Sequence, residues 1–317
     1  MESLSKAEIS RAIREKSLEM GFAGCGFSGA RKLDEDSRRL KQWLKEGHHA
    51  GMGYMENHLE KRTDPARLVE EALSVISLIY NYYTDVKQED PEAPIISTYA
   101  YGKDYHRVLK DKLFLLFEFI RTIVPEAKGR VFVDSAPVLD RAWAREAGLG
   151  WIGKNSLLIS RKYGSYVFIG EIILNVPLEY NQVPENDFCG SCSRCMEACP
   201  TGAILENRIL DSELCISYQT IENRGEIREQ VKGKLHGRVF GCDICQEVCP
   251  WNRKAKLHAE PDFDPLPELM SMSQQQWADL TPDNFNLLFR DSAVKRAGYD
   301  KLKDTLQDIK ISAEKSS

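Results

Sequence analysis

The sequence contains no apolar run of the roughly 18 residues that a membrane-spanning helix requires. The first eight residues have neither the apolar segment of a signal peptide nor a twin-arginine signal, and no stretch is of low complexity. An excess of one charge is also missing: the net charge is −5 over 317 residues, which gives no overall attraction for nucleic acid. These absences predict a folded, monomeric protein of the cytoplasm with no membrane contact.

One segment departs from this charge balance. Residues 216–256 carry eight Lys or Arg against five Asp or Glu, a local charge of +3. A surface that faces RNA and an ordinary solvated helix face explain such a segment equally well.

Helical and strand patterns alternate through the first 178 residues. Ser5 and Glu8 have the spacing of a capping box at the start of a helix. The patterns predict helices at residues 5–21, 34–45, 104–123 and 137–147, and strands at residues 73–83, 130–134 and 166–174. This alternation favours a layered α/β or α+β core over a helix bundle or a β-sandwich.

Proline and polar residues at 177–187 mark the end of that core. We therefore expect a catalytic core at residues 1–178, a cysteine-rich module at 179–255 and a helical C-terminal tail at 256–317. Ser271 and Thr281 are the expected helix caps in the tail.

Eight of the nine cysteines lie in the module. Residues 189–200 read Cys-x2-Cys-x2-Cys-x3-Cys-Pro, which is the spacing of bacterial ferredoxins with two [4Fe–4S] clusters. In that arrangement the fourth cysteine binds the other cluster, so a second set must exist. It is present as Cys215 followed by Cys242, Cys245 and Cys249, with Pro250 closing the pattern.

The crossing rule assigns all eight cysteines to two clusters. The first takes Cys189, Cys192, Cys195 and Cys249, and the second takes Cys199, Cys215, Cys242 and Cys245. A pair of zinc sites is the alternative, because Cys-x2-Cys pairs also suit tetrahedral zinc. Cys25 lies far upstream and is expected to be a buried apolar thiol.

Two short motifs resemble cofactor sites only superficially. Gly148, Gly150 and Gly153 match G-x-G-x-x-G, but they follow a predicted helix, whereas a dinucleotide-binding loop follows a strand and opens a helix. We interpret them as a helix end and a turn. Residues 46–51 (Glu-Gly-His-His-Ala-Gly) differ at one position, Glu for Asp, from the D-x-H-x-x-G motif whose histidine is the lower ligand of cobalamin. We interpret that match as coincidence.

A family resemblance is carried by several motifs in order. They are residues 61–65 (Lys-Arg-Thr-Asp-Pro), 101–106 (Tyr-Gly-Lys-Asp-Tyr-His), 133–141 (Val-Asp-Ser-Ala-Pro-Val-Leu-Asp-Arg), 151–156 (Trp-Ile-Gly-Lys-Asn-Ser), 163–165 (Tyr-Gly-Ser) and the complete cysteine module. Together they extend from about residue 50 to 255, and the sequence resembles the epoxyqueuosine reductase family.

The resemblance implies an α+β fold: a nitroreductase-like or reductive-dehalogenase-like cobalamin-binding core with an inserted ferredoxin-like module and a short helical tail. It implies that electrons pass through two [4Fe–4S] clusters to cobalamin, which reduces epoxyqueuosine to queuosine at the wobble position of tRNA. The expected partners are that tRNA and an electron donor of the flavodoxin or ferredoxin type.

The family's proton donor maps to Asp134. The residues support this role, because Asp134 ends a predicted strand, where open α/β sheets place their chemistry, and a carboxyl enclosed by cofactor should have a raised pKa. A helix N-cap is the alternative role.

The resemblance also implies contacts to substrate and cofactor. Tyr105 and His106 would stack on and hydrogen-bond to the modified base, and Arg141 would orient a carboxylate or phosphate. Arg62, Ser97, Asp134, Lys154 and Asn155 would contact the cofactor.

Two departures from the family pattern stand out. Ser97 occupies a place where some relatives have cysteine, so no thiolate near the cobalt takes part. The C-terminal helical-repeat extension of longer relatives is not expected, which leaves the tail and residues 216–256 to hold tRNA. Rival interpretations are a reductive dehalogenase, a flavin reductase on the same core and a non-catalytic ferredoxin-type electron carrier.

Overall fold

A four-stranded sheet forms the centre of the larger part of the molecule. The computed structural model describes residues 4–183 and 187–314. The strands run in the order β1 (Gly24–Gly29), β2 (Ser74–Asn81), β7 (Val167–Leu174) and β4 (Gly129–Phe132), and all neighbouring strands are antiparallel. The two central strands, β2 and β7, are covered on both faces, which explains why their sequences are nearly continuous apolar runs.

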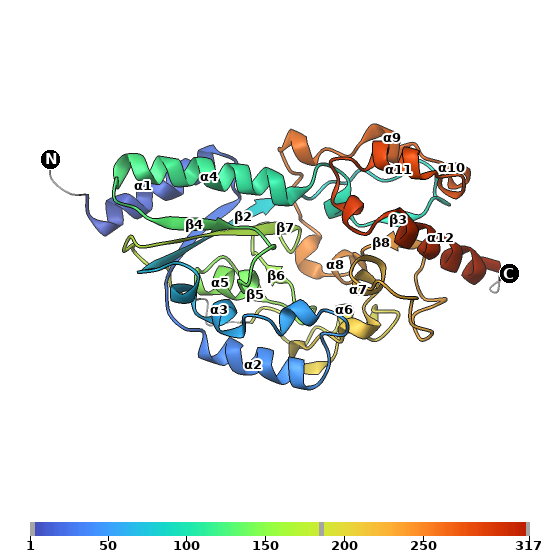
Figure 1. The fold of residues 1–317 in the computed structure, drawn as a ribbon, viewed down its shortest axis with the longest axis horizontal. Helices are drawn as coiled ribbons and strands as arrows, with labels where there is room; N and C mark the ends of the chain where they lie inside the picture. Colours follow the sequence, from blue (N-terminus) through green and yellow to red (C-terminus); the bar gives the residue numbers. More distant parts are fainter. Residues whose placement is uncertain (1–3, 184–186, 315–317) are drawn as a thin grey trace.

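Helices cover both faces of this sheet (Figure 1). α1 (Lys6–Glu19) and α4 (Tyr105–Ile123) lie on one face. α5 (Asp140–Glu146) packs on the other, with α2 (Asp34–Lys45) and α3 (Leu59–Thr63) outside it. The mixed helix and sheet composition and the layered arrangement agree with the predicted α+β core.

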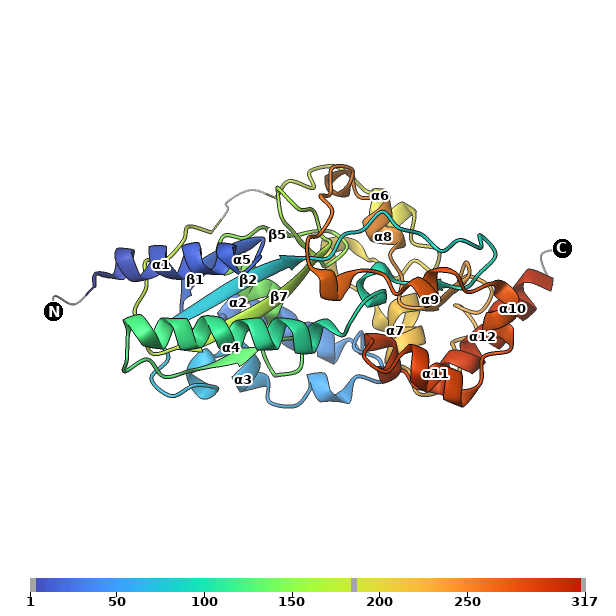
Figure 2. The ribbon, with the colours of Figure 1, turned by 90° about the horizontal axis from the view of Figure 1, so that it is seen from above.

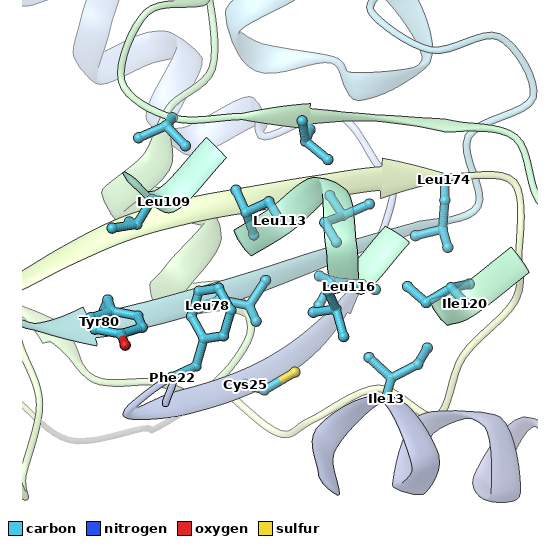
Figure 3. Packing of buried hydrophobic residues seen from close by; sticks show 14 of the residues in the cluster. Ile13, Phe22, Cys25, Leu78, Tyr80, Leu109, Leu113, Leu116, Ile120 and Leu174 are labelled. Carbon is cyan, nitrogen blue, oxygen red and sulfur yellow. The ribbon is translucent and has the colours of Figure 1, made fainter. Parts of the chain in front are cut away.

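The core between α4 and the sheet is apolar (Figure 3). Leu109, Leu113 and Leu116 recur at helical spacing on α4 and are fully buried against Leu78 of β2. Cys25 of β1 points into the same cluster and is 7% exposed. The expectation of a buried apolar thiol is confirmed, and burial raises the pKa of this thiol to about 12.

Helix caps follow the sequence closely. The Ser5 side chain accepts a hydrogen bond from the backbone N–H of Glu8, and the Glu8 carboxylate accepts one from the backbone N–H of Ser5. The predicted capping box is therefore confirmed. Ser273 and Thr281 cap helices in the tail, whereas Ser271 lies at the end of a helix rather than at its start.

A second lobe holds the cysteine module and the C-terminal helices (Figure 2). Its helices are α6 (Arg194–Glu197), α7 (Ile216–Ile221), α8 (Ile244–Glu247), α9 (Pro267–Met270), α10 (Gln274–Ala278), α11 (Pro282–Leu288) and α12 (Tyr299–Glu314). A segment of the first part reaches into this lobe, where β3 (Ile95–Ile96) pairs in parallel with β8 (Arg238–Phe240).

The tail shares a hydrophobic core with the module. Trp277 and Phe289 from the tail lie in one buried cluster with Phe240 of β8 and Ile96 of β3. The tail is helical, as expected, but it is an integral layer of the second lobe. The boundaries at residues 178 and 255 stay predictions, and the packing runs across the second of them.

Three local features differ from the sequence expectations or extend them. β1 was not predicted, because its sequence Gly-Cys-Gly-Phe-Ser-Gly has low strand propensity. α5 begins at Asp140 rather than near residue 137, since residues 133–139 form a loop. Gly148 and Gly150 lie between α5 and the short hairpin of β5 (Trp151–Ile152) and β6 (Leu158–Ile159), and Gly153 lies in the turn of that hairpin. This confirms that the three glycines belong to a helix end and a turn. None of the described helices is both long and apolar enough to cross a membrane.

The close approach of α5 to the sheet gives the first prediction. A Cβ atom on Gly26 of β1 would clash with the backbone carbonyl oxygen of Ala147, which follows α5. Gly26→Ala should therefore destabilise the protein by about 1–3 kcal/mol, measured by urea unfolding followed by circular dichroism.

Gly53→Ala is the matched control, because a Cβ atom there meets nothing within 4 Å. It should leave the unfolding midpoint nearly unchanged. Equal midpoints for the two variants would contradict the packing described for α5.

Candidate active site

A large cavity opens at one end of the central sheet. Its volume is about 2130 Å³, roughly twice the upper end of the range usual for small-ligand pockets. Tyr82 after β2, Asp134 after β4 and Val167 at the start of β7 line it. Antiparallel pairing brings these strand ends to one edge. The strand-end rule for parallel sheets, used above for Asp134, does not apply to this sheet, although Asp134 does reach the cavity.

Asp134 is held by two aromatic residues from the start of α4. Its φ of 47° lies in the left-handed region, which aspartate tolerates better than most residues. The Tyr105 hydroxyl donates a hydrogen bond to Oδ2 of Asp134, and Nε2 of His106 lies 3.6 Å from the same oxygen. The Asp134 side chain is 53% exposed, so it is accessible from the cavity.

Tyr105 is itself fixed by stacking. Its ring centroid lies 4.2 Å from that of Phe168 and 4.1 Å from that of His106. Two rings at these distances cannot share one face, so both faces of Tyr105 are covered. The expectation that Tyr105 stacks on a base is therefore wrong for this arrangement, and its hydroxyl positions Asp134 instead.

His106 lies between two carboxylates. Nδ1 of His106 is 2.7 Å from Oδ1 of Asp104, which also caps α4 by accepting the backbone N–H of His106. Burial opposes protonation, but the hydrogen bonds and charges of Asp104 and Asp134 outweigh it and raise the pKa of His106 to about 9. His106 is therefore a cation at neutral pH.

The protein groups around Asp134 favour its ionised form. Burial would raise its pKa, but the hydrogen bonds from His106 and Tyr105, with the positive charges of His106 and Arg296, lower the pKa of Asp134 below its ordinary value. The expectation of a raised pKa concerned a carboxyl enclosed by cofactor and stays a prediction. Arg296 and Asp104 were given no role from the sequence, and Arg296 lies in the tail, where no motif marks it.

Most other predicted site residues line the same cavity. Arg62, Ser97, Arg141 and Asn155 all contribute to its wall. Arg62 donates to the backbone carbonyls of Tyr54 and Asn57, and Arg141 donates to that of Ser156, so both also brace cavity loops.

Asn155 and Lys154 differ in their relation to the cavity. Nδ2 of Asn155 is buried without a hydrogen-bond partner in the described part of the chain. Lys154 is not among the residues that line the cavity.

The eight module cysteines form two groups. Cys195 is close to Cys189 and Cys249, and Cys249 is also close to Cys192. In the other group, Cys215 is close to Cys199 and Cys242, and Cys245 is close to Cys215 and Cys242. Cys195 and Cys245 lie where the two groups meet. This division matches the one that the crossing rule predicts.

Burial raises the pKa of five of these thiols, those of Cys195, Cys215, Cys242, Cys245 and Cys249. Burial and then the neighbouring thiols raise the pKa of Cys195, and burial raises the pKa of Cys242 to about 12. In the described residues no three His, Cys, Asp or Glu side chains lie close enough to hold a single metal ion. A [4Fe–4S] cluster spreads its four thiolates more widely than a zinc ion does, so the spacing favours clusters over zinc.

The groups face different surroundings. Cys199, Cys215, Cys242 and Cys245 line the large cavity. Cys189 and Cys192 instead line a shallow depression on the outer surface, together with Arg194 and Pro250.

Three of the eight cations of residues 216–256 form ion pairs with residues that the structure describes. Arg228 pairs with Glu213 at 2.5 Å, and Arg238 pairs with Glu247 at 3.2 Å. Lys232 lies within 3.8 Å of both Glu226 and Glu229. Both interpretations left open by the sequence stay predictions. The cations that line the cavity come from elsewhere and include Arg107, Arg290, Lys295 and Arg296.

Comparison with known proteins decides the family. The chain is 48% identical to epoxyqueuosine reductase from Cellulophaga algicola over 306 residues, covering 96% of this chain and 99% of that protein. The chain belongs to the epoxyqueuosine reductase family. Residues 62–135 match the family model "Epoxyqueuosine reductase QueG, DUF1730", and residues 188–252 match a "4Fe-4S double cluster binding domain".

Solved structures of this family share the fold. An epoxyqueuosine reductase solved with an epoxyqueuosine-modified tRNA-Tyr stem loop superposes with a TM-score of 0.86 at 31% identity, covering 94% of this chain and 79% of that one. The epoxyqueuosine reductase from Bacillus subtilis, solved with its catalytic loop swung out of the active site, gives 0.85 at 30% identity with the same coverage.

The charge of His106 gives the second prediction. In Asp104→Asn the helix cap survives, but the strongest partner of the imidazolium is lost. The pKa of His106, followed by NMR titration of its ring, should fall from about 9 by roughly one to three pH units.

The raised pKa of His106 also predicts that the stability of the folded protein depends on pH. The raised pKa of His106 contributes stability that is present below pH 6.5 and is lost as the pH rises through about 9. Asp104→Asn should weaken this loss. A His106 that titrates near pH 6.5 in the unmodified protein would contradict the geometry of the Asp104, His106 and Asp134 cluster.

Proposed function

We propose that this protein reduces epoxyqueuosine in tRNA to queuosine, with electrons passing through two [4Fe–4S] clusters to a cobalamin in the cavity and with Asp134 as proton donor. One observation carries the proposal: a single cavity is lined both by Asp134 and by four module cysteines. Electron delivery and acid chemistry thus meet in one space.

The thiol groups support the ligand sets expected from the sequence. Cys189, Cys192, Cys195 and Cys249 bind the first cluster, and Cys199, Cys215, Cys242 and Cys245 bind the second. The positions of Cys195 and Cys245, where the groups meet, leave the clusters near enough for electrons to pass between them.

The different surroundings of the two cysteine groups indicate the direction in which electrons flow. The first cluster lies beside the outer depression of Cys189 and Cys192, and the second lies in the cavity wall. Electrons therefore enter from a flavodoxin-type or ferredoxin-type donor that docks over residues 189–194 and leave toward the cavity. The protein acts as a monomer in the cytoplasm.

The cavity fits a cobalamin in size and in chemistry. Its volume far exceeds that needed for a small ligand, and the unpartnered Nδ2 of Asn155 offers a hydrogen-bond donor to a cofactor amide or phosphate. Ser97 and Arg62 also line the cavity and contact the cofactor. When bound, cobalamin supplies a low-potential electron donor and nucleophile that can open an epoxide.

Residues of the chain itself donate the proton and bind the tRNA. Asp134 protonates the departing epoxide oxygen, while the Tyr105 hydroxyl and His106 fix its position. Arg290, Lys295 and Arg296 from the tail line the cavity, where they attract the phosphates of the anticodon loop. Arg141 orients the modified base.

The acid role of Asp134 gives the third prediction. Asp134→Asn should keep iron content and tRNA binding but lower queuosine formation by roughly 10²–10⁴-fold, because the amide cannot donate a proton at the rate a carboxylic acid can. Product is measured by mass spectrometry of nucleosides from an epoxyqueuosine-containing stem loop.

Asp111→Asn is the matched control, since Asp111 is another carboxylate of the cavity wall and has no place in the mechanism. It should retain activity. Normal turnover by Asp134→Asn would remove Asp134 from the acid role.

The ligand sets give the fourth prediction. Cys195→Ala should lower the iron content from about eight atoms per chain, two clusters' worth, to about four. Cys25→Ala, which removes a thiol from the core far from the module, should leave iron unchanged. Iron is measured colorimetrically after anaerobic reconstitution, and a full complement in Cys195→Ala would refute the assignment.

A further inference from the structure

A buried glutamate lies in the central sheet behind the cavity. Glu171 of β7 is fully buried, and neither of its carboxylate oxygens receives an N–H or O–H from any side chain or backbone group that the structure describes. An ionised carboxylate in such a place costs on the order of several kcal/mol. Burial, and then the charge of Asp140, therefore raise the pKa of Glu171 well above its ordinary value.

The group that faces Glu171 is Asp140, the first residue of α5. α5 packs on β7, and Oδ1 of Asp140 is likewise buried with no N–H or O–H donor among residues 4–183 and 187–314. The two carboxyl groups lie close enough that each shifts the pKa of the other and that they can hydrogen-bond once one of them is protonated. Because no other donor reaches these buried oxygens, two negative charges there are strongly disfavoured, and the pair keeps at least one proton.

Asp140 connects this pair to the reaction space, because it also lines the cavity. Burial, and then the Asp134 charge, raise its pKa to about 7 against the opposing effects of Glu171 and Arg141. Arg62 also attracts the ionised form of Asp140. The pair thus gains and loses a proton near neutral pH.

The reaction needs such a group. Reduction of an epoxide to an alkene and water consumes two electrons and two protons. Asp134 carries one proton at a time, and its lowered pKa leaves it ionised at neutral pH. His106 is a weaker acid than Asp140, since its pKa is about 9 against about 7.

We propose that Asp140 and Glu171 form a proton-sharing carboxyl pair that supplies protons to Asp134 during epoxide reduction. The inference rests on the proposed function. In each transfer the O–H bond of Asp140 breaks, an O–H bond forms on Asp134, and the negative charge moves to the pair, where the remaining proton of Glu171 stabilises it. Solvent protons then restore the pair, and both electrons come from the clusters.

The test is the pH dependence of single turnover with pre-reduced clusters and an epoxyqueuosine stem loop. In the unmodified protein the rate should fall about tenfold per pH unit above about 7, as Asp140 loses its proton. Asp140→Asn should lower the rate at pH 6 by roughly 10²-fold and abolish the fall near pH 7, because the amide has no proton to give.

Glu171→Gln separates the proton role from packing. The amide keeps the shape and still donates to Asp140, but more weakly than a carboxyl O–H, so the fall in rate should persist and move to higher pH. Ser77→Ala is the packing control, since Ser77 is buried directly opposite Glu171 on β2. It should leave the profile unchanged.

The outcomes are distinguishable. If unmodified protein forms no queuosine, the proposed function fails. If it is active and Asp140→Asn keeps a fall in rate with a midpoint near pH 7, only the carboxyl pair is overturned. Should Asp140→Asn not fold, infrared titration of the unmodified protein decides: a protonated-carboxyl band that disappears with a midpoint near pH 7 supports the pair, and its absence overturns it.

Discussion

The arrangement depends on one constraint: four partly buried cysteines and a solvent-accessible carboxylate share the wall of one cavity. The antiparallel sheet brings the ends of β2, β4 and β7 to a single edge, and the second lobe closes over that edge. Residues 93–101 and the tail lock this lobe in place through a common hydrophobic cluster. If the lobes separated, the module cysteines and Asp134 would no longer line one cavity.

The charged side chains beside Asp134 in the cavity compensate one another by ion pairing, not by exposure to solvent. The carboxylates of Asp104 and Asp134 hold a charged imidazole between them, and Arg296 adds a second positive charge from the tail. Behind them, Asp140 and Glu171 have carboxyl oxygens that are buried without a hydrogen-bond partner among the described residues, and burial raises the pKa of both groups. The same wall therefore carries acids with opposite shifts of pKa, which is how neighbouring carboxyls acquire different roles in proton transfer.

Local and periodic signals predicted much of the fold. The capping box at Ser5, the buried runs of β2 and β7 and the spacing of the cysteines each depend on residues near one another in the chain. β1 escaped prediction because its glycines are required by the approach of α5, a long-range contact. The pairing of β3 with β8 and the place of the tail in the second core depend on contacts across more than 100 residues, which no local pattern reveals.

The residues of the candidate site were also predicted only in part. The motifs led to Asp134, His106 and the cysteine groups, but not to Arg296, to Glu171 or to the covered faces of Tyr105. A lone arginine in a polar tail and a lone glutamate in an apolar strand become informative only when their neighbours are known. Nor did the sequence indicate the hydrogen bonds from His106 and Tyr105 that lower the pKa of Asp134.

The central claim is that two iron–sulfur clusters and a corrinoid occupy one protein chain, within reach of each other. Anaerobic ultraviolet and visible spectroscopy after reconstitution with iron, sulfide and cobalamin tests this most directly. The account predicts a spectrum in which cluster and corrinoid bands appear together, and in which a chemical reductant of the clusters also reduces the bound corrinoid. A spectrum of clusters alone, unchanged by added cobalamin, would contradict it.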